Sequence, residues 1–172
     1  MLKVKKISAV VAASLLAALA LAPGASAATP TTLTTTQKAQ LKYLIEEEKL
    51  ARDVYTYLAT NVTSQKFSNI LKSEQTHMDA VAAILKTYKL ANPTTSRKPG
   101  VFKNDELQAL YKDLIAQGKA SPAAAIEVGV SIEELDISDL EKMLEKKWPA
   151  DVKLMLENLL KASYNHLAAF QR

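Results

Sequence analysis

The sequence predicts an all-α protein in which four long helices form an antiparallel bundle. Apolar side chains recur every three or four residues along four segments, which is the period of a helix with one buried face. No segment shows the alternation of apolar and polar residues typical of a strand, and none carries a glycine-rich phosphate loop. A proline-containing connection separates the second segment from the third, so we expect one long crossover.

The first two helices are expected to form an antiparallel pair. Thr34 and Gln37 fit a capping box, and the first helix then continues to about Thr60. The second helix is expected from about Gln65 to Leu90, after a short Asn-Val-Thr-Ser turn. Such a short connection makes the two helices antiparallel neighbours.

The crossover is expected to occupy residues 91–118. Its first part, residues 91–102, carries two prolines and a glycine and is predicted to be irregular. The second part begins with acidic residues, which favour a helix N-terminus, and Gly118 is placed to end that helix. The crossover is therefore predicted to contain one short extra helix.

The third and fourth helices are expected to form the second pair. Ser121 supplies an N-terminal cap, and Pro122 stands at the first helical position of the third helix. Ser138 and Glu141 offer a further capping box, so the third helix is either continuous or divided at that point. The fourth helix follows a Lys-Trp-Pro corner and is expected over residues 150–171.

The N-terminal segment has the features of an export signal. Residues 1–27 contain three lysines, an apolar run and a small-residue cleavage site before Ala28. A membrane anchor needs about 18 or more uninterrupted apolar residues, and the cleavage site also argues against one. We therefore expect a secreted or periplasmic protein without stable membrane insertion after cleavage. The mature chain would have a flexible lead over residues 28–35 and one domain over residues 36–172.

Composition limits the chemistry that this chain can perform. The 172 residues are 48% apolar and 23% charged, which suits a single soluble domain. Removal of the three signal lysines lowers the net charge from +4 to +1, so the charge gives no reason to expect nucleic-acid binding. Because the sequence has no cysteine, it offers no disulfide, thiolate nucleophile, iron–sulfur cluster or rubredoxin-like module.

Ionisable side chains interrupt the predicted apolar faces at four positions. Glu48 lies in the first helix, Glu74 and His77 form a Glu-x-x-His motif in the second, and His166 lies in the fourth. For Glu48 or His166 alone, an edge position or a hydrogen-bonded core histidine is an equally good explanation. A buried, uncompensated carboxylate costs several kcal/mol of a total stability of about 5–15 kcal/mol. Together the four residues favour a shared pair of divalent metal ions.

Two motifs resemble those of a known superfamily. Glu-x-x-Ala-Arg-x-x-Tyr at residues 48–55 resembles the first di-iron helix of rubrerythrin and other ferritin-like proteins, and Glu-x-x-His at residues 74–77 resembles the second. Four passages resemble an uncharacterised bacterial and archaeal branch of that superfamily, domain-of-unknown-function family 2202: EEEKLARDVY, SEQTHMDAV, GVSIEELDISDL and ASYNHLAAF. The resemblance implies a ferritin-like four-helix bundle that holds two iron ions, or manganese, with Glu48, Glu74 and His77 as ligands from its first half.

The second half of the expected site departs from the pattern. The fourth helix should offer Glu-x-x-His, but this sequence has Ser163 three residues before His166. Glu127 lies about as far before the Lys-Trp-Pro corner as His166 lies after it, at about 1.5 Å of rise per residue. Glu134 would be level with the site only if the third helix kinks, and it can equally be an exposed acid beside Glu133. Since both glutamates together would make the metal pair neutral, both are candidates.

Other residues near the expected site receive simpler interpretations. Tyr55 is expected to donate a hydrogen bond to a ligand, to relay electrons or to be a core tyrosine, and Ser163 is expected beside the ligands. Four charged residues of the first helix are expected to face solvent or make surface contacts, with Glu47 nearest to the buried face: Glu46, Glu47, Arg52 and Asp53. The alternative for Arg52 and Asp53 is that either orients a ligand.

The export signal and the resemblance together imply an exported ferritin-like protein whose metal pair reacts with dioxygen or peroxide. The reaction would be that of a ferroxidase, a peroxidase or another oxidoreductase, and the electron donor would be external. One alternative is a non-catalytic bundle that the ions hold together, and another is a metal-free interaction module. The sequence is compatible with a homo-oligomer and specifies neither the native metal nor the substrate.

Overall fold

The regular structure of the described part of the chain is entirely helical. In a computed structural model that describes residues 32–62, 64–95 and 97–172, these residues form helices and no strand, which confirms the predicted all-α class. The signal-peptide prediction and residues 28–31 of the lead lie outside the described ranges. No helix within those ranges is both long and apolar enough to cross a membrane. The helices are α1 Thr35–Asn61, α2 Gln65–Thr87, α3 Asp105–Gly118, α4 Pro122–Leu144 and α5 Ala150–Phe170.

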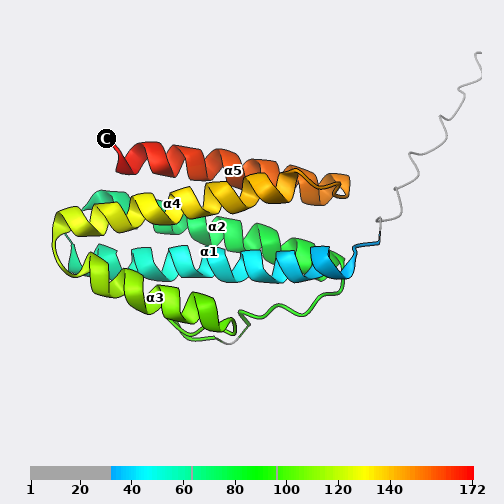
Figure 1. Cartoon of the computed structure of the whole chain (residues 1–172), viewed down its shortest axis with the longest axis horizontal. Helices are drawn as coiled ribbons and strands as arrows, with labels where there is room; N and C mark the ends of the chain where they lie inside the picture. The colour runs from blue at the N-terminus through cyan, green and yellow to red at the C-terminus, as the bar shows by residue number, and fades with distance from the viewer. Residues whose placement is uncertain (1–31, 63, 96) are drawn as a thin grey trace, which may run out of the picture.

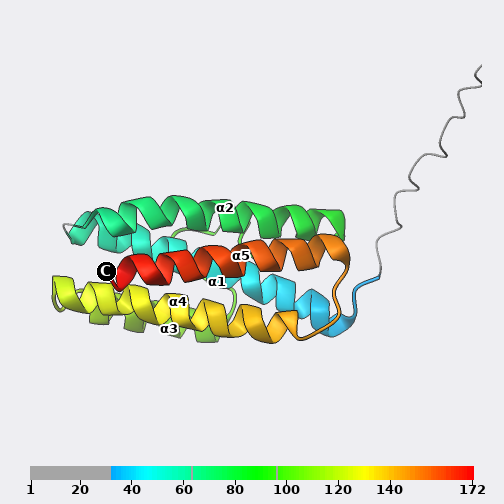
Figure 2. The ribbon, with the colours of Figure 1, turned by 90° about the horizontal axis from the view of Figure 1, so that it is seen from above.

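The four long helices lie side by side as two pairs (Figure 1). α1 packs along α2, and α4 packs along α5, with further contacts between α2 and α5 and between α1 and α4. The crossover returns the chain to the end of the molecule at which α2 begins, so α2 and α4 run in the same direction (Figure 2). The short helix α3 of that crossover packs against α1 and α4.

Local sequence signals set most helix ends. Thr34 and Gln37 form the predicted capping box, and Leu33 beside them is buried against the core. α2 ends at Thr87, three residues before the predicted end. Lys89 adopts a positive φ of 54°, and the Leu90 amide donates to the Leu85 carbonyl, which is the hydrogen-bond pattern of a Schellman stop.

The third helix is continuous. α4 begins at Pro122 after the Ser121 cap, whose side chain accepts a hydrogen bond from the Ala124 amide. It continues through Ser138 without a break, so the alternative of two shorter helices is wrong.

The apolar core has two parts. One cluster includes Tyr55, Phe67 and Phe170, whose ring centroids lie 5.3 to 5.8 Å apart. Gly129 permits this packing, because a Cβ atom there would lie 2.6 Å from the Phe170 ring. The other cluster lies around Leu41 and the beginning of α5. Between these two clusters each long helix carries buried ionisable side chains.

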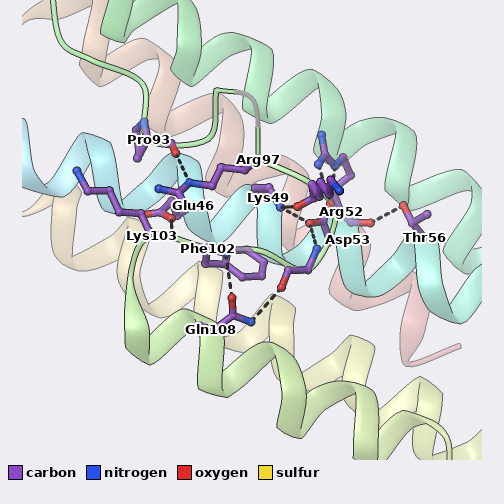
Figure 3. A network of polar contacts seen from close by, with 12 residues as sticks. Glu46, Lys49, Arg52, Asp53, Thr56, Pro93, Arg97, Phe102, Lys103 and Gln108 are labelled. Atoms are coloured by element: carbon purple, nitrogen blue, oxygen red, sulfur yellow. Dashed lines mark hydrogen bonds and ion pairs between the residues drawn. The ribbon is translucent and has the colours of Figure 1, made fainter.

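The first part of the crossover is attached to α1 by buried charges (Figure 3). Lys49 and Asp53 form an ion pair, and both side chains are almost fully buried. Lys49 also donates to the Lys98 carbonyl at 3.1 Å, while Asp53 accepts a hydrogen bond from the Gly100 amide at 2.8 Å. Lys49 lies 4.4 Å from the centre of the Phe102 ring, which covers it. This ion pair therefore joins α1 to residues 98–102.

Two expectations for this face of α1 are wrong. Glu46 was expected to face solvent, but it is buried and accepts hydrogen bonds from the Lys103 and Asn104 amides at 2.5 and 3.3 Å. Asp53 was expected at the surface and is also buried. Arg52 remains half-buried and contacts Asp53 and Gln75. The crossover covers this face, so α1 is buried on a side that its apolar pattern leaves polar.

Asp53→Ala should destabilise the fold strongly. The change leaves the Lys49 ammonium buried without its partner, which typically costs about 3–5 kcal/mol. Urea unfolding followed by circular dichroism measures this loss. Asp113→Ala on the exposed side of α3 is the control, with an expected change of at most about 0.5 kcal/mol. Equal effects of the two changes would contradict the proposed anchoring.

Candidate metal centre

Five ionisable side chains from the four long helices meet between the two apolar clusters. We call them the central cluster: Glu48 of α1, Glu74 and His77 of α2, Glu133 of α4 and His166 of α5. None of them is more than 8% exposed. The spacing of Glu74 and His77 places both on one face of α2, and the antiparallel pairing brings Glu48 opposite them.

The His77 half of the cluster holds two carboxylates against one imidazole. His77 Nδ1 lies 3.1 Å from Glu48 Oε2 and 3.0 Å from Glu74 Oε2. The other ring nitrogen, Nε2, lies 3.4 Å from Ser73 Oγ, which can orient the ring. This half therefore offers two oxygens and one nitrogen in a buried position.

The His166 half repeats the arrangement and shares one carboxylate. His166 Nδ1 lies 2.9 Å from Glu74 Oε1 and 3.4 Å from Glu133 Oε2. The two imidazole rings stack with centroids 5.4 Å apart. One oxygen of Glu74 thus faces each histidine, as in a carboxylate that bridges two metal ions.

Unpartnered polar atoms in the cluster fit a divalent ion in each half. Glu48 Oε1, Glu74 Oε1, Glu133 Oε2 and His166 Nδ1 are buried without a hydrogen-bond partner among the described residues. His166 Nδ1 and Glu74 Oε1 are close, but their approach lacks hydrogen-bond geometry. Such orphaned groups are rare in folded proteins and require an explanation. In each half the three donor atoms lie within 4.8 Å of one another, so one ion can contact all three.

The α4 glutamate that joins the cluster differs from those that the sequence predicted. Glu127 and Glu134 both lie on the exposed side of α4, so neither joins the cluster. Seven residues separate them, which places them on the same helix face. Their height along the helix axis matches that of His166 to different degrees, but height alone does not determine the direction in which a side chain points. The buried face of α4 instead carries Glu133, which continues the four-residue spacing of Ala125 and Gly129.

The two residues expected beside the ligands have different environments. Tyr55 is fully buried and its hydroxyl donates a 2.6 Å hydrogen bond to Glu133 Oε1. Ser163 is buried one turn before His166, but its hydroxyl donates to the Leu159 carbonyl at 3.2 Å. Tyr55 can therefore orient Glu133, a candidate ligand, whereas the Ser163 hydroxyl is engaged with the backbone of its own helix.

Two further buried acids adjoin the cluster, and the sequence pattern did not indicate them. Glu47 was expected to face solvent but is 3% exposed, and Asp136 of α4 is 4% exposed. Burial raises the pKa of both carboxyl groups well above their ordinary values, and neighbouring acids add to the effect. Asp136 lies three residues after Glu133, a spacing that indicates a shared helix face once Glu133 is known to be buried.

In the absence of metal ions, the two histidines of the cluster bind protons instead. Burial disfavours the charged form of His77, but Glu48 and Glu74 prevail and raise its pKa to about 10. Burial likewise opposes charge on His166, while Glu133 and Glu74 raise its pKa to about 9. Burial opposes ionisation of Glu74, yet the two imidazoles lower its pKa to about 2. Without metal ions, both imidazoles are therefore expected to be protonated at neutral pH and to compensate Glu74, while burial raises the pKa of Glu48 to about 7.

Stability and metal affinity should respond to pH in opposite directions. The stabilisation from the raised histidine pKa values is complete below about 6.5 and is lost as pH rises towards 9 to 10. Urea unfolding with a chelator present should therefore show weaker stability at pH 9 than at pH 6.5. Over this range, the apparent metal affinity should rise by up to about tenfold per pH unit for each proton that the metal displaces. Competition with a chelator of known affinity measures this change. Affinity that does not change with pH would exclude displacement of imidazole protons.

Glu48 and Glu46 give a matched pair for testing the site. Glu48→Gln should remove at least the ion bound in the His77 half, because that half loses an ionised ligand. Glu46→Gln should leave the metal stoichiometry unchanged and lower stability by about 1–3 kcal/mol, because two crossover amides lose a charged acceptor. Titration of the chelated protein with Co(II) and urea unfolding give the two measurements. Loss of metal from both variants, or from neither, would contradict this assignment.

Comparison with known proteins gives a family without an assigned activity. Uncharacterized protein MJ0754 of Methanocaldococcus jannaschii is 47% identical over 136 residues, which cover 79% of this chain and 74% of that protein. The crystal structure of hypothetical protein MJ0754 from Methanococcus jannaschii superposes with a TM-score of 0.81 at 44% identity, covering 84% of this chain and 83% of the other. The family model described as Uncharacterized protein domain (DUF2202) matches residues 37–172. The chain therefore belongs to the DUF2202 family.

Proposed function

We propose that this chain is an exported ferritin-like protein that holds two divalent ions, iron or manganese, and reacts with dioxygen or peroxide. The observation that carries the proposal is the position of Glu74 between two histidines, each of which faces a further buried glutamate. An isolated buried acid would be hydrogen-bonded or protonated. A carboxylate shared by two such groups is the arrangement that a metal pair requires.

The helix order supports the ferritin-like assignment. The central cluster takes a glutamate from α1, a Glu-x-x-His motif from α2, a glutamate from α4 and a histidine from α5. A long crossover joins two antiparallel pairs, as in ferritin-like bundles. Ser163 stands where a second Glu-x-x-His motif would have its glutamate, so the proposed centre has one bridging carboxylate.

Two bound Fe(II) ions would supply two electrons, enough to reduce dioxygen to peroxide or peroxide to water. The protein residues position the ligands and keep the site dry. Tyr55 holds one oxygen of Glu133, which leaves the other directed at His166. The aromatic cluster of Tyr55, Phe67 and Phe170 excludes water on one side. An external donor would have to return electrons, since the sequence contains no cysteine for an iron–sulfur relay.

The centre is buried, so only small reactants can reach it. The same burial is compatible with the alternative of a purely structural metal site. His77 and His166 are 5% and 8% exposed, and four pockets on the described surface are lined by residues outside the central cluster. Dioxygen and peroxide are small enough to reach such a site through fluctuations, whereas larger organic substrates are not. In the alternative, the ions would only stabilise the folded state.

Addition of Fe(II) in air separates the two functions. Mature protein freed of metal by chelation should consume dioxygen faster than buffer containing the same Fe(II), and it should develop the absorption of a carboxylate-bridged ferric pair. An oxygen electrode and stopped-flow absorbance measure these changes.

Glu74→Ala/His77→Ala should reduce oxygen consumption to the buffer rate. Glu127→Ala is the control and should behave like the wild type, because its side chain is exposed on α4. If the protein binds Fe(II) but oxidises it no faster than buffer does, the catalytic function is contradicted and the structural function is supported.

A further inference from the structure

Buried carboxylates extend from the central cluster towards a surface pocket. Glu133, Asp136 and Asp139 follow one another at three-residue spacing on α4, so their side chains lie along one stripe of that helix. The stripe covers about 9 Å along the axis at about 1.5 Å of rise per residue. Glu47 of α1 lines the same pocket as Asp139 and so adds a carboxylate from the facing helix. The acids thus connect the cluster with the α1–α4 surface.

The outer end of this stripe opens into a pocket of about 320 Å³ between α1 and α4. Glu47 and Asp139 both line it, together with Gln40 and Tyr43. The Asp139 side chain is 27% exposed, whereas Glu47 is 3% exposed. Exposure therefore decreases from Asp139 to Glu47 and remains low at Asp136, which is 4% exposed.

The inner acids carry oxygens that no described residue satisfies. Glu47 Oε1 and Asp136 Oδ2 are buried without a hydrogen-bond partner among the described residues, and so is Gln40 Oε1 in the pocket lining. These three oxygens are neither part of the central cluster nor engaged with the crossover. Oxygen atoms presented in this way suit a hard divalent cation.

The ammonium group of a lysine, Lys142, lies beside the pocket but does not block it. Lys142 pairs with Asp139 at 2.8 Å, but the lysine side chain is 65% exposed. Surface ion pairs of this kind are weak, at about 0–1 kcal/mol, and an arriving divalent cation can displace the ammonium group. Glu47 and Asp136 have no ion-pair partner within the described residues.

We propose that Asp139, Glu47 and Asp136 form the route by which divalent cations pass from the α1–α4 pocket to the central cluster. This inference rests on the proposed function, since it takes the cluster to be the destination of the ions. Each step along the route offers oxygen ligands only, whereas the cluster adds two imidazoles. Because imidazole strengthens binding of Fe(II), Co(II) and Zn(II), a cation gains affinity as it moves inward. The acids concentrate cations at the pocket, and the histidines retain them.

The test is the rate at which metal-free protein takes up Co(II), followed by stopped-flow absorbance. Glu47→Gln and Asp136→Asn should each slow uptake by about tenfold or more, as expected when a charged path that focuses ions is interrupted. The final stoichiometry should equal that of the wild type. Asp139→Asn at the more exposed end gives the same test with less risk to folding. Glu134→Gln removes one charge from the exposed side of α4 and should change the rate by less than about twofold.

Each contrary outcome has its own signature. Variants that take up Co(II) at the wild-type rate would overturn the route while leaving the central cluster as a metal site. Loss of an ion from Glu47→Gln or Asp136→Asn at equilibrium would make that residue a ligand and overturn its role in transit. A wild-type protein that binds no Co(II) at equilibrium would overturn the proposed function together with the route.

Discussion

The structure depends on the mutual compensation of charges in one layer of its core. Glu74 lies between His77 and His166, and Glu48 and Glu133 close the layer on either side. Removing one member would leave another ionisable group buried without compensation, which is costly in a low-dielectric interior. Because the five groups come from four helices, the layer fixes the register of every long helix against the others. The apolar clusters on either side fill the space around this layer.

Three consecutive glutamates of α1 serve three different parts of the molecule. Glu46 binds the crossover backbone, Glu47 lines the α1–α4 pocket, and Glu48 belongs to the central cluster. About 100° of helix rotation separates each residue from the next, which directs successive side chains to different sides. With Lys49 and Asp53 also buried against the crossover, α1 is enclosed on most sides. The buried charges of α1 therefore connect it to several parts of the molecule.

Helical periodicity predicted the five helices, the Thr34 capping box and the crossover, because local residues determine each of them. It also placed Glu48, Glu74, His77 and His166 on buried faces, and the structure brings these four side chains together. The α4 glutamate was missed because a level along the axis does not specify which way a side chain points. The burial of Glu46 and Asp53 was missed for another reason. It depends on the path of the irregular crossover, and no period in the sequence encodes that path.

The metal content of the protein purified from cells tests the central claim most directly. The DUF2202 family has no assigned activity, so the metal itself is the first fact to establish. Elemental analysis should find two transition-metal ions per chain in the wild type, one for each half of the cluster. Glu74→Ala should lose both ions, because that carboxylate is shared by the two halves. Two ions retained by Glu74→Ala, or none in the wild type, would contradict the shared centre.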